Sequence, residues 1–192
     1  MKNSKSINLI LTAMFIAIGI ILPFFTGQIK QIGNMLLPMH LPIMLCGLIC
    51  GPWYGLASGL ITPFLRSIIF GMPPLFPTAA AMMLELAAYG AVIGFLYSRS
   101  KWKCVFALLR SLAIAMICGR IVWGAAMAVF MGINGNAFTL SAFAAGAFLN
   151  AIPGIILQFI LIPIIMTILG KSKIIRFSKS KKELSADEKQ SD

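Results

Sequence analysis

The chain has 192 residues, of which 59% are hydrophobic and only 11% are charged. With a mean hydropathy of +0.94, this composition excludes a soluble globular core and is typical of a single-domain polytopic membrane protein. The net charge of +11 would suggest nucleic-acid binding in a soluble chain. No soluble basic domain with interleaved aromatic residues is present to carry that role, so we expect no nucleic-acid partner.

Basic residues gather in three clusters along the chain: Lys2 with Lys5, Arg99 to Lys103, and Lys171 to Lys182. Because basic residues mark the cytoplasmic ends of membrane spans, all three clusters should face the cytoplasm. The stretch Met39–Ile69 is longer than the roughly 20 residues that cross a bilayer once. It is therefore either one kinked span or two spans with a turn at Gly51-Pro52, where proline disfavours a continuous helix. Two spans keep the 98–104 cluster in the cytoplasm.

We therefore predict an all-α membrane protein, a bundle of six transmembrane helices with both termini in the cytoplasm. The expected spans are 7–25, 36–50, 52–70, 76–97, 105–131 and 142–169. Residues 1–170 form the single transmembrane domain. Residues 171–192 form a basic tail, which we expect to be disordered and to contact anionic lipid headgroups. The expected location is the bacterial plasma membrane.

The first span carries Ala13 and Ala17 four residues apart, a spacing that gives another helix a flat strip to pack on. No small-x-small cleavage site follows this span, so we expect it to stay in the mature protein. The loop after it is polar at its start and apolar at its end, which suits a loop that folds over a cavity. Asn34 in this loop is a candidate ligand contact.

The stretch 39–70 has glycine at every fourth position, at Gly47, Gly51, Gly55 and Gly59. Small residues at this spacing let two helix backbones approach closely in lipid, so we predict a packing seam. Cys46 and Cys50 lie one turn apart here, but two further metal ligands are lacking, so we expect buried free thiols and no metal. His40 is expected at the membrane interface, satisfied by water or backbone.

Apart from Arg110, which lies near the cytoplasmic end of its span and can extend to the interface, three charged residues fall within the later predicted spans: Arg66, Glu85 and Arg120. Each costs at least roughly 2.5–3.5 kcal/mol at membrane depth, so each should face a partner or a water-filled cavity. Two arginines against one glutamate leave a positive charge that favours an anionic ligand, above all a carboxylate held bidentately. The alternative is that Glu85 pairs with one arginine while the other extends to the interface.

Polar and aromatic neighbours of these charges complete the candidate site. Tyr89 follows Glu85 by one helical turn, and Trp123 follows Arg120 in the same way, so both are expected to line an apolar wall with polar edges. Asn150 lies in the sixth span. The predicted substrate-binding residues are Arg66, Glu85, Tyr89, Arg120, Trp123, Asn150 and Asn34. We expect no catalytic residue, metal or cofactor.

The Ala13-xxx-Ala17 strip and the run LPIMLCGLICGPWYGLASGLITPFLRSIIFG, residues 41–71, resemble the substrate-binding S components of energy-coupling factor (ECF) vitamin transporters over residues 7–170. The resemblance implies a six-helix protein that captures a vitamin or its precursor from outside, under the first outer loop. It also implies docking on a T component that two cytoplasmic ATPases drive, with Ala13 and Ala17 in the docking strip. Ligand residues vary within this family and do not transfer by motif.

Motifs that the sequence lacks indicate the function, as does the resemblance. There is no GxxxxGK[ST] phosphate loop and no pair of membrane carboxylates, so the chain is not an autonomous pump. Within the family, a small acid such as pantothenate suits the surplus arginine and points to the pantothenate-type subgroup, with folate or thiamine as alternative vitamins. A ligand-free structural subunit and an intramembrane enzyme remain as alternatives from other classes. We expect a transport subunit and no enzyme.

Overall fold

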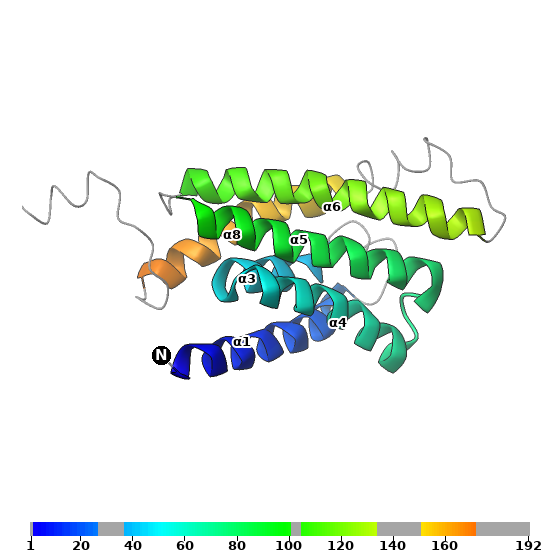
Figure 1. The fold of residues 1–192 in the computed structure, drawn as a ribbon, viewed down its shortest axis with the longest axis horizontal. Coiled ribbons are helices and arrows are strands. Elements are labelled where there is room, and N and C mark those ends of the chain that lie inside the picture. Colours follow the sequence, from blue (N-terminus) through cyan, green and yellow to red (C-terminus); the bar gives the residue numbers. More distant parts are fainter. Residues whose placement is uncertain (1, 27–36, 101–104, 134–150, 172–192) are drawn as a thin grey trace, which may run out of the picture.

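The computed structural model describes residues 2–26, 37–100, 105–133 and 151–171, and these residues form a bundle of helices without a strand (Figure 1). The helices in chain order are α1 (Lys2–Ile21), η1 (Leu22–Thr26), α3 (His40–Cys50), α4 (Pro52–Phe70), η2 (Leu75–Ala79), α5 (Ala80–Arg99), α6 (Val105–Ile133) and α8 (Ile152–Lys171). The all-α prediction is confirmed. The start of α1 and the end of α8 lie at the same end of the bundle, together with the end of α5 and the start of α6.

Four stretches of the described chain are long and apolar enough to cross a membrane: Lys5–Phe24, Leu75–Arg99, Val105–Ile133 and Ile152–Gly170. The short helix α3 has 11 residues, which at 1.5 Å per residue is about 16 Å, roughly half of a bilayer core. In α4, two prolines and Arg66 interrupt the apolar sequence. The six-span topology and the cytoplasmic position of the termini therefore stay predictions.

The chain turns between α3 and α4 at Gly51, as predicted. Gly51 has φ +105°, a conformation that glycine adopts without strain, and Pro52 occupies the first turn of α4, where its missing amide hydrogen is not needed. The two helices then touch through their backbones, since a Cβ placed on Gly55 would lie 2.7 Å from the Cα of Gly47. The stretch is a helical hairpin.

Helix α5 lies at the centre of the bundle and packs against α3, α4 and α6. A Cβ on Gly94 would lie 2.6 Å from the carbonyl oxygen of Gly47, and one on Gly55 would lie 2.6 Å from the carbonyl oxygen of Gly90. A Cβ on Gly59 would likewise strike the α5 backbone. The predicted glycine seam is confirmed at Gly47, Gly55 and Gly59, whose partner surface is α5, but not at Gly51, where a Cβ would meet nothing within 4 Å.

In two predicted spans the regular α-helix begins later than the first residue expected, for local backbone reasons. The span expected from residue 36 begins as α3 at His40, because Leu37 has φ +50° and Pro38 follows it. The span expected from residue 76 continues as α5 from Ala80, since Phe76 precedes a proline and is extended at φ −128° and ψ 136°. Of the span expected at 142–169, residues 142–150 lie outside the described residues, as does the tail 172–192.

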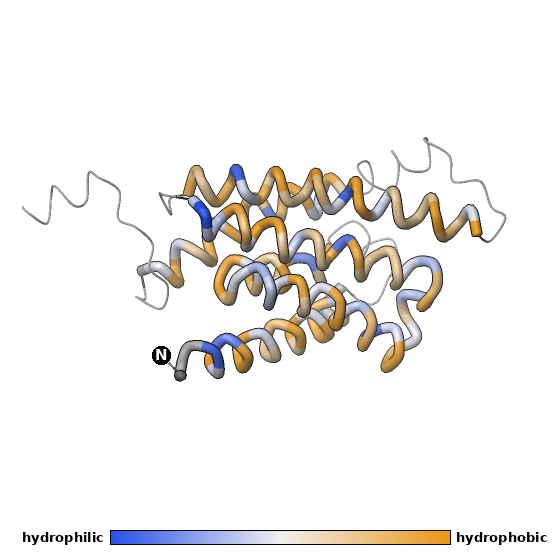
Figure 2. The backbone as a smooth tube through the Cα atoms, in the orientation of Figure 1, coloured by the Kyte–Doolittle hydropathy of each residue, from blue (hydrophilic) through white to orange (hydrophobic). Residues whose placement is uncertain are grey.

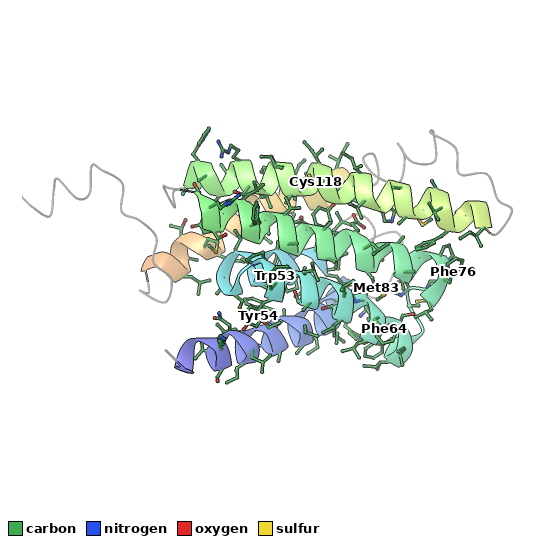
Figure 3. All side chains as sticks on the ribbon, viewed as in Figure 1. Trp53, Tyr54, Phe64, Phe76, Met83 and Cys118 are labelled. Carbon is green, nitrogen blue, oxygen red and sulfur yellow. The ribbon has the colours of Figure 1, made fainter. Side chains whose placement is uncertain are left out.

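Apolar residues recur along all the helices (Figure 2), and many large apolar side chains are exposed on the outside of the bundle. The labelled side chains of Trp53, Phe64 and Phe76 lie on the outside, and Trp53 is 79% exposed (Figure 3). Exposed apolar side chains in this number suit a lipid environment, because lipid does not penalise them as water does. The interior contains an apolar core that includes Leu112 and Met166, and it also contains a buried polar cluster.

Candidate ligand-binding site

The buried polar cluster is centred on Glu85 of α5, whose side chain is 2% exposed. Its Oε1 atom accepts a hydrogen bond from the Tyr89 hydroxyl at 3.1 Å and lies 3.0 Å from Nη1 of Arg120 on α6. His40, the first residue of α3, places Nε2 3.6 Å from the same oxygen. We call these four residues the Glu85 cluster: His40, Glu85, Tyr89 and Arg120.

The local sequence explains how α5 and α6 place these side chains next to one another. Tyr89 follows Glu85 by four residues, so both lie on one face of α5. On α6, Gly119 leaves room for the Tyr89 ring, because a Cβ there would lie 2.6 Å from Cε1 of the ring. Arg120 follows directly and reaches Glu85. The glycine therefore admits the aromatic ring against α6 beside the arginine.

Several polar atoms at this site are buried without a hydrogen-bond partner among the described residues: Nδ1 and Nε2 of His40, Nε and Nη2 of Arg120, and Oε1 of Gln158. Gln158 on α8 adjoins the cluster, since its Nε2 lies 3.5 Å from the Leu37 carbonyl oxygen that also accepts from the His40 amide. Buried polar groups are normally paired, and an unpaired one costs free energy. These atoms are therefore candidates for contacts with a ligand.

The Glu85 cluster lies toward the end of the bundle opposite Lys5 and Arg99. His40 opens α3, and Glu85 lies near the start of α5, whereas Arg99 ends α5 and Lys5 lies in the first turns of α1. If the positive-inside rule orients the chain, the cluster lies in the outer half of the membrane.

Arg66 lies outside the Glu85 cluster. It is 5% exposed, donates from Nη1 to the Ile20 carbonyl oxygen at 2.8 Å, and places its guanidinium 5.5 Å from the Phe24 ring centroid and 5.7 Å from that of Phe70. Within the described ranges no carboxylate pairs with it. Arg120, and not Arg66, is therefore the partner of Glu85 among the described residues, and Arg66 ties the end of α1 to α4.

The remaining predicted site residues are distributed as follows. Trp123 is partly buried on α6, one turn beyond Arg120. Asn34 and Asn150 lie outside the described residues. Ala13 and Ala17 are both exposed on α1, which leaves the small-residue strip accessible on the outside of the helices that the structure describes.

Sequence reasoning missed two residues at this site. The expectation that His40 lies at the interface, satisfied by water or backbone, was wrong: its side chain is 2% exposed and faces Glu85. Gln158 is 1% exposed and was not among the predicted ligand contacts. The available signal was the same as for Glu85, because each is a polar side chain inside an apolar helix.

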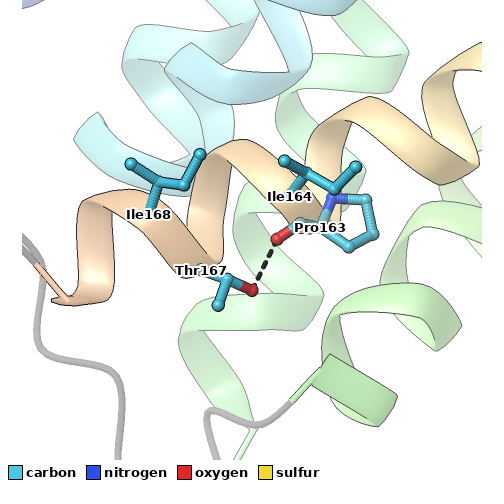
Figure 4. A pocket seen from close by; sticks show the side chains of 4 residues that line it. All are labelled: Pro163, Ile164, Thr167 and Ile168. Atoms are coloured by element: carbon cyan, nitrogen blue, oxygen red, sulfur yellow. Dashed lines mark hydrogen bonds between the residues drawn. The ribbon is translucent and has the colours of Figure 1, made fainter.

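A surface pocket on α8 is distinct from this cluster. Its lining residues, Pro163, Ile164, Thr167 and Ile168, all come from the second half of one helix, and the Thr167 hydroxyl donates to the Pro163 carbonyl oxygen at 2.7 Å (Figure 4). Walls from a single helix do not enclose a small molecule. We therefore assign no ligand to this pocket.

The fold and the site define a multi-pass helical membrane protein with a buried polar cluster, and comparison with known proteins gives its family. The model of the ECF transporter substrate-specific component matches residues 8–166. The chain therefore belongs to the family of ECF transporter substrate-specific components, and it is a transporter subunit of the cell membrane. No curated protein and no solved structure matched the chain. Membership implies, in general, a vitamin ligand and partnership with a T component and ATPases.

Proposed function

We propose that this subunit captures a small vitamin with a carboxylate group at the Glu85 cluster. The observation that supports this proposal is which nitrogens of the Arg120 guanidinium have partners. Nη1 faces Glu85, while Nε and Nη2 are buried without partners among the described residues. In a guanidinium these two nitrogens form one edge with parallel N–H groups, the geometry that binds a carboxylate bidentately.

The other unpaired atoms narrow the chemistry of the ligand. The two ring nitrogens of His40 can each form a hydrogen bond with a ligand, and Oε1 of Gln158 is an acceptor. A ligand that suits the site therefore carries a carboxylate together with hydroxyl or amide groups. Pantothenate has a carboxylate, an amide and two hydroxyl groups, and it is our favoured ligand. Trp123, Asn34 and Asn150 stay predicted contacts.

The test is equilibrium binding of labelled pantothenate to the purified chain, with folate and thiamine as competitors. We expect tight binding of pantothenate that neither competitor displaces. Tight binding of thiamine, which lacks a carboxylate, with no binding of pantothenate would overturn the carboxylate assignment. Failure of every vitamin to bind a folded chain would instead support a ligand-free structural subunit.

Arg120→Lys is the most informative variant. Lysine keeps a positive charge beside Glu85, so the buried carboxylate stays paired, but it lacks the two-nitrogen edge. We expect pantothenate affinity to fall by about 2–5 kcal/mol, the usual cost of losing one partner of a buried charged contact, with little change in folding. Arg110→Lys is the matched control, because Arg110 is exposed on the same helix. Equal affinities in the two variants would contradict the proposal.

A further inference from the structure

The charges of the Glu85 cluster balance before a ligand binds but not after a carboxylate binds. Glu85 and Arg120 form one ion pair at 3.0 Å, so with a neutral His40 the cluster has no net charge. A carboxylate on the open edge of Arg120 would place two negative charges on one guanidinium. Inside a protein, where charges are weakly screened, such an excess is costly unless a nearby group compensates for it.

His40 is positioned to compensate for this excess negative charge. Its ring lies 5.3 Å from the Tyr89 ring, and Nε2 lies 3.6 Å from Oε1 of Glu85, while both ring nitrogens are buried and unpaired among the described residues. Oε1 already takes contacts from Tyr89 and Arg120. Histidine is the side chain that most readily gains a proton near neutral pH.

The described helices around His40 offer no other suitable group. From α5 the titratable groups are Glu85 and Tyr89, and from α6 the charged group is Arg120. Helix α8 contributes the neutral Gln158. On α4, Arg66 is occupied by the Ile20 carbonyl oxygen. Within the part of the chain that the structure describes, His40 is thus the side chain that can add a positive charge at this point.

We propose that His40 takes up one proton from solvent when a carboxylate ligand binds to Arg120, which makes it a residue that selects for anionic ligands. This inference rests on the proposed function. The balance is simple: neutral His40, one proton and the ligand carboxylate give a histidinium beside two carboxylates and one guanidinium. No covalent bond forms or breaks apart from the new N–H bond.

The experiment is titration calorimetry of the full purified chain in buffers of different ionisation enthalpy, which counts protons taken up. With pantothenate we expect uptake of close to one proton per ligand. Wherever binding takes up one proton, the Kd should rise about tenfold for each unit of pH, because that proton becomes scarcer. Panthenol, in which an alcohol replaces the carboxylate, should bind without proton uptake. Equal uptake with the two ligands would overturn the inference.

The variant His40→Gln locates the proton. Glutamine keeps hydrogen-bonding capacity but does not titrate, so pantothenate binding should become weaker and lose its proton uptake. Full uptake in this variant would place the proton on Glu85 and overturn the inference. If the wild-type chain binds pantothenate with no proton uptake, the inference fails while the proposed function stands. If it binds no vitamin at all, both fail.

Discussion

At the scale of single residues, the site depends on one small side chain as much as on its charged ones. Gly119 lets α6 approach the ring of Tyr89, and Tyr89 in turn donates to Glu85. The same approach brings Arg120 within 3.0 Å of Glu85. A methyl group at residue 119 would therefore disturb the ring, the hydrogen bond and the ion pair together.

Gly119→Ala tests this dependence. The added Cβ would lie 2.6 Å from Tyr89 Cε1, so the ring must move, and overpacking of this kind costs about 1–3 kcal/mol. We expect a lower thermal unfolding temperature in detergent and weaker pantothenate binding. In a Tyr89→Ala background the same substitution should cost almost nothing, because the clash has gone. If the losses of stability from Gly119→Ala and Tyr89→Ala simply add up in the double variant, the added Cβ does not clash with Tyr89.

At the scale of helices, the seam between the α3–α4 hairpin and α5 sets the register of the site. Backbone contacts leave no flexible side chain to adapt, because Gly90 faces the Gly55 backbone directly. The register of α3 along α5 fixes how far His40 lies from Glu85. Stability and site geometry therefore depend on the same seam.

Gly90→Ala is the matching prediction for the seam. Its Cβ would meet the backbone of Gly55, which cannot rotate away, so we expect destabilisation of about 1–3 kcal/mol or more. Gly132→Ala is the control, since a Cβ on Gly132 meets nothing within 4 Å and alanine favours a helix by up to about 1 kcal/mol. The measurement is the thermal unfolding temperature of each variant. Equal temperatures would refute the role of the seam in stability.

Helix α1 supports a separate prediction about partners. We propose that the T component docks on the strip of Ala13 and Ala17, both of which are exposed. The double variant with leucine at both positions should co-purify poorly with the T component and ATPases but bind pantothenate normally, because bulk blocks close helix approach. Leucines at Ala125 and Ala128, which are exposed on α6, provide the control. Normal assembly of the Ala13 and Ala17 variant would rule out this strip.

Sequence patterns located some elements and missed others for identifiable reasons. The range 52–70 was predicted as it stands in α4, because Pro52 and Gly71 bound that helix through local backbone preferences. The pairing of Glu85 with Tyr89 also follows from local spacing. The choice of Arg120 over Arg66 depends on how α6 and α4 are set against α5, and the position of His40 depends on the backbone at Leu37. Local sequence does not encode these relations directly.

At the scale of the whole molecule, helix α3 is shorter than its partner α4 and than the other described α-helices. Six described α-helices are consistent with the predicted spans, yet α3 covers about half of a bilayer core. The Glu85 cluster lies between this hairpin and the longer helices α5 and α6. If the turn at Gly51 lies at the cytoplasmic surface, as the predicted topology has it, the short α3 places His40 within the membrane, which is consistent with the burial of His40.

Thiol labelling in intact cells tests the predicted topology. In a chain without native cysteines, single cysteines would replace Trp53 at the hairpin turn, Met72 after α4 and Ser98 at the end of α5, all of which are exposed. If α3 and α4 both cross, an impermeant reagent should label Met72→Cys in intact cells, and label Trp53→Cys and Ser98→Cys only after lysis. A single span through residues 39–70 would reverse the result for Ser98→Cys, because every later loop would then lie on the other side of the membrane. Labelling of Ser98→Cys in intact cells would therefore contradict the six-span topology and the outward position of the Glu85 cluster.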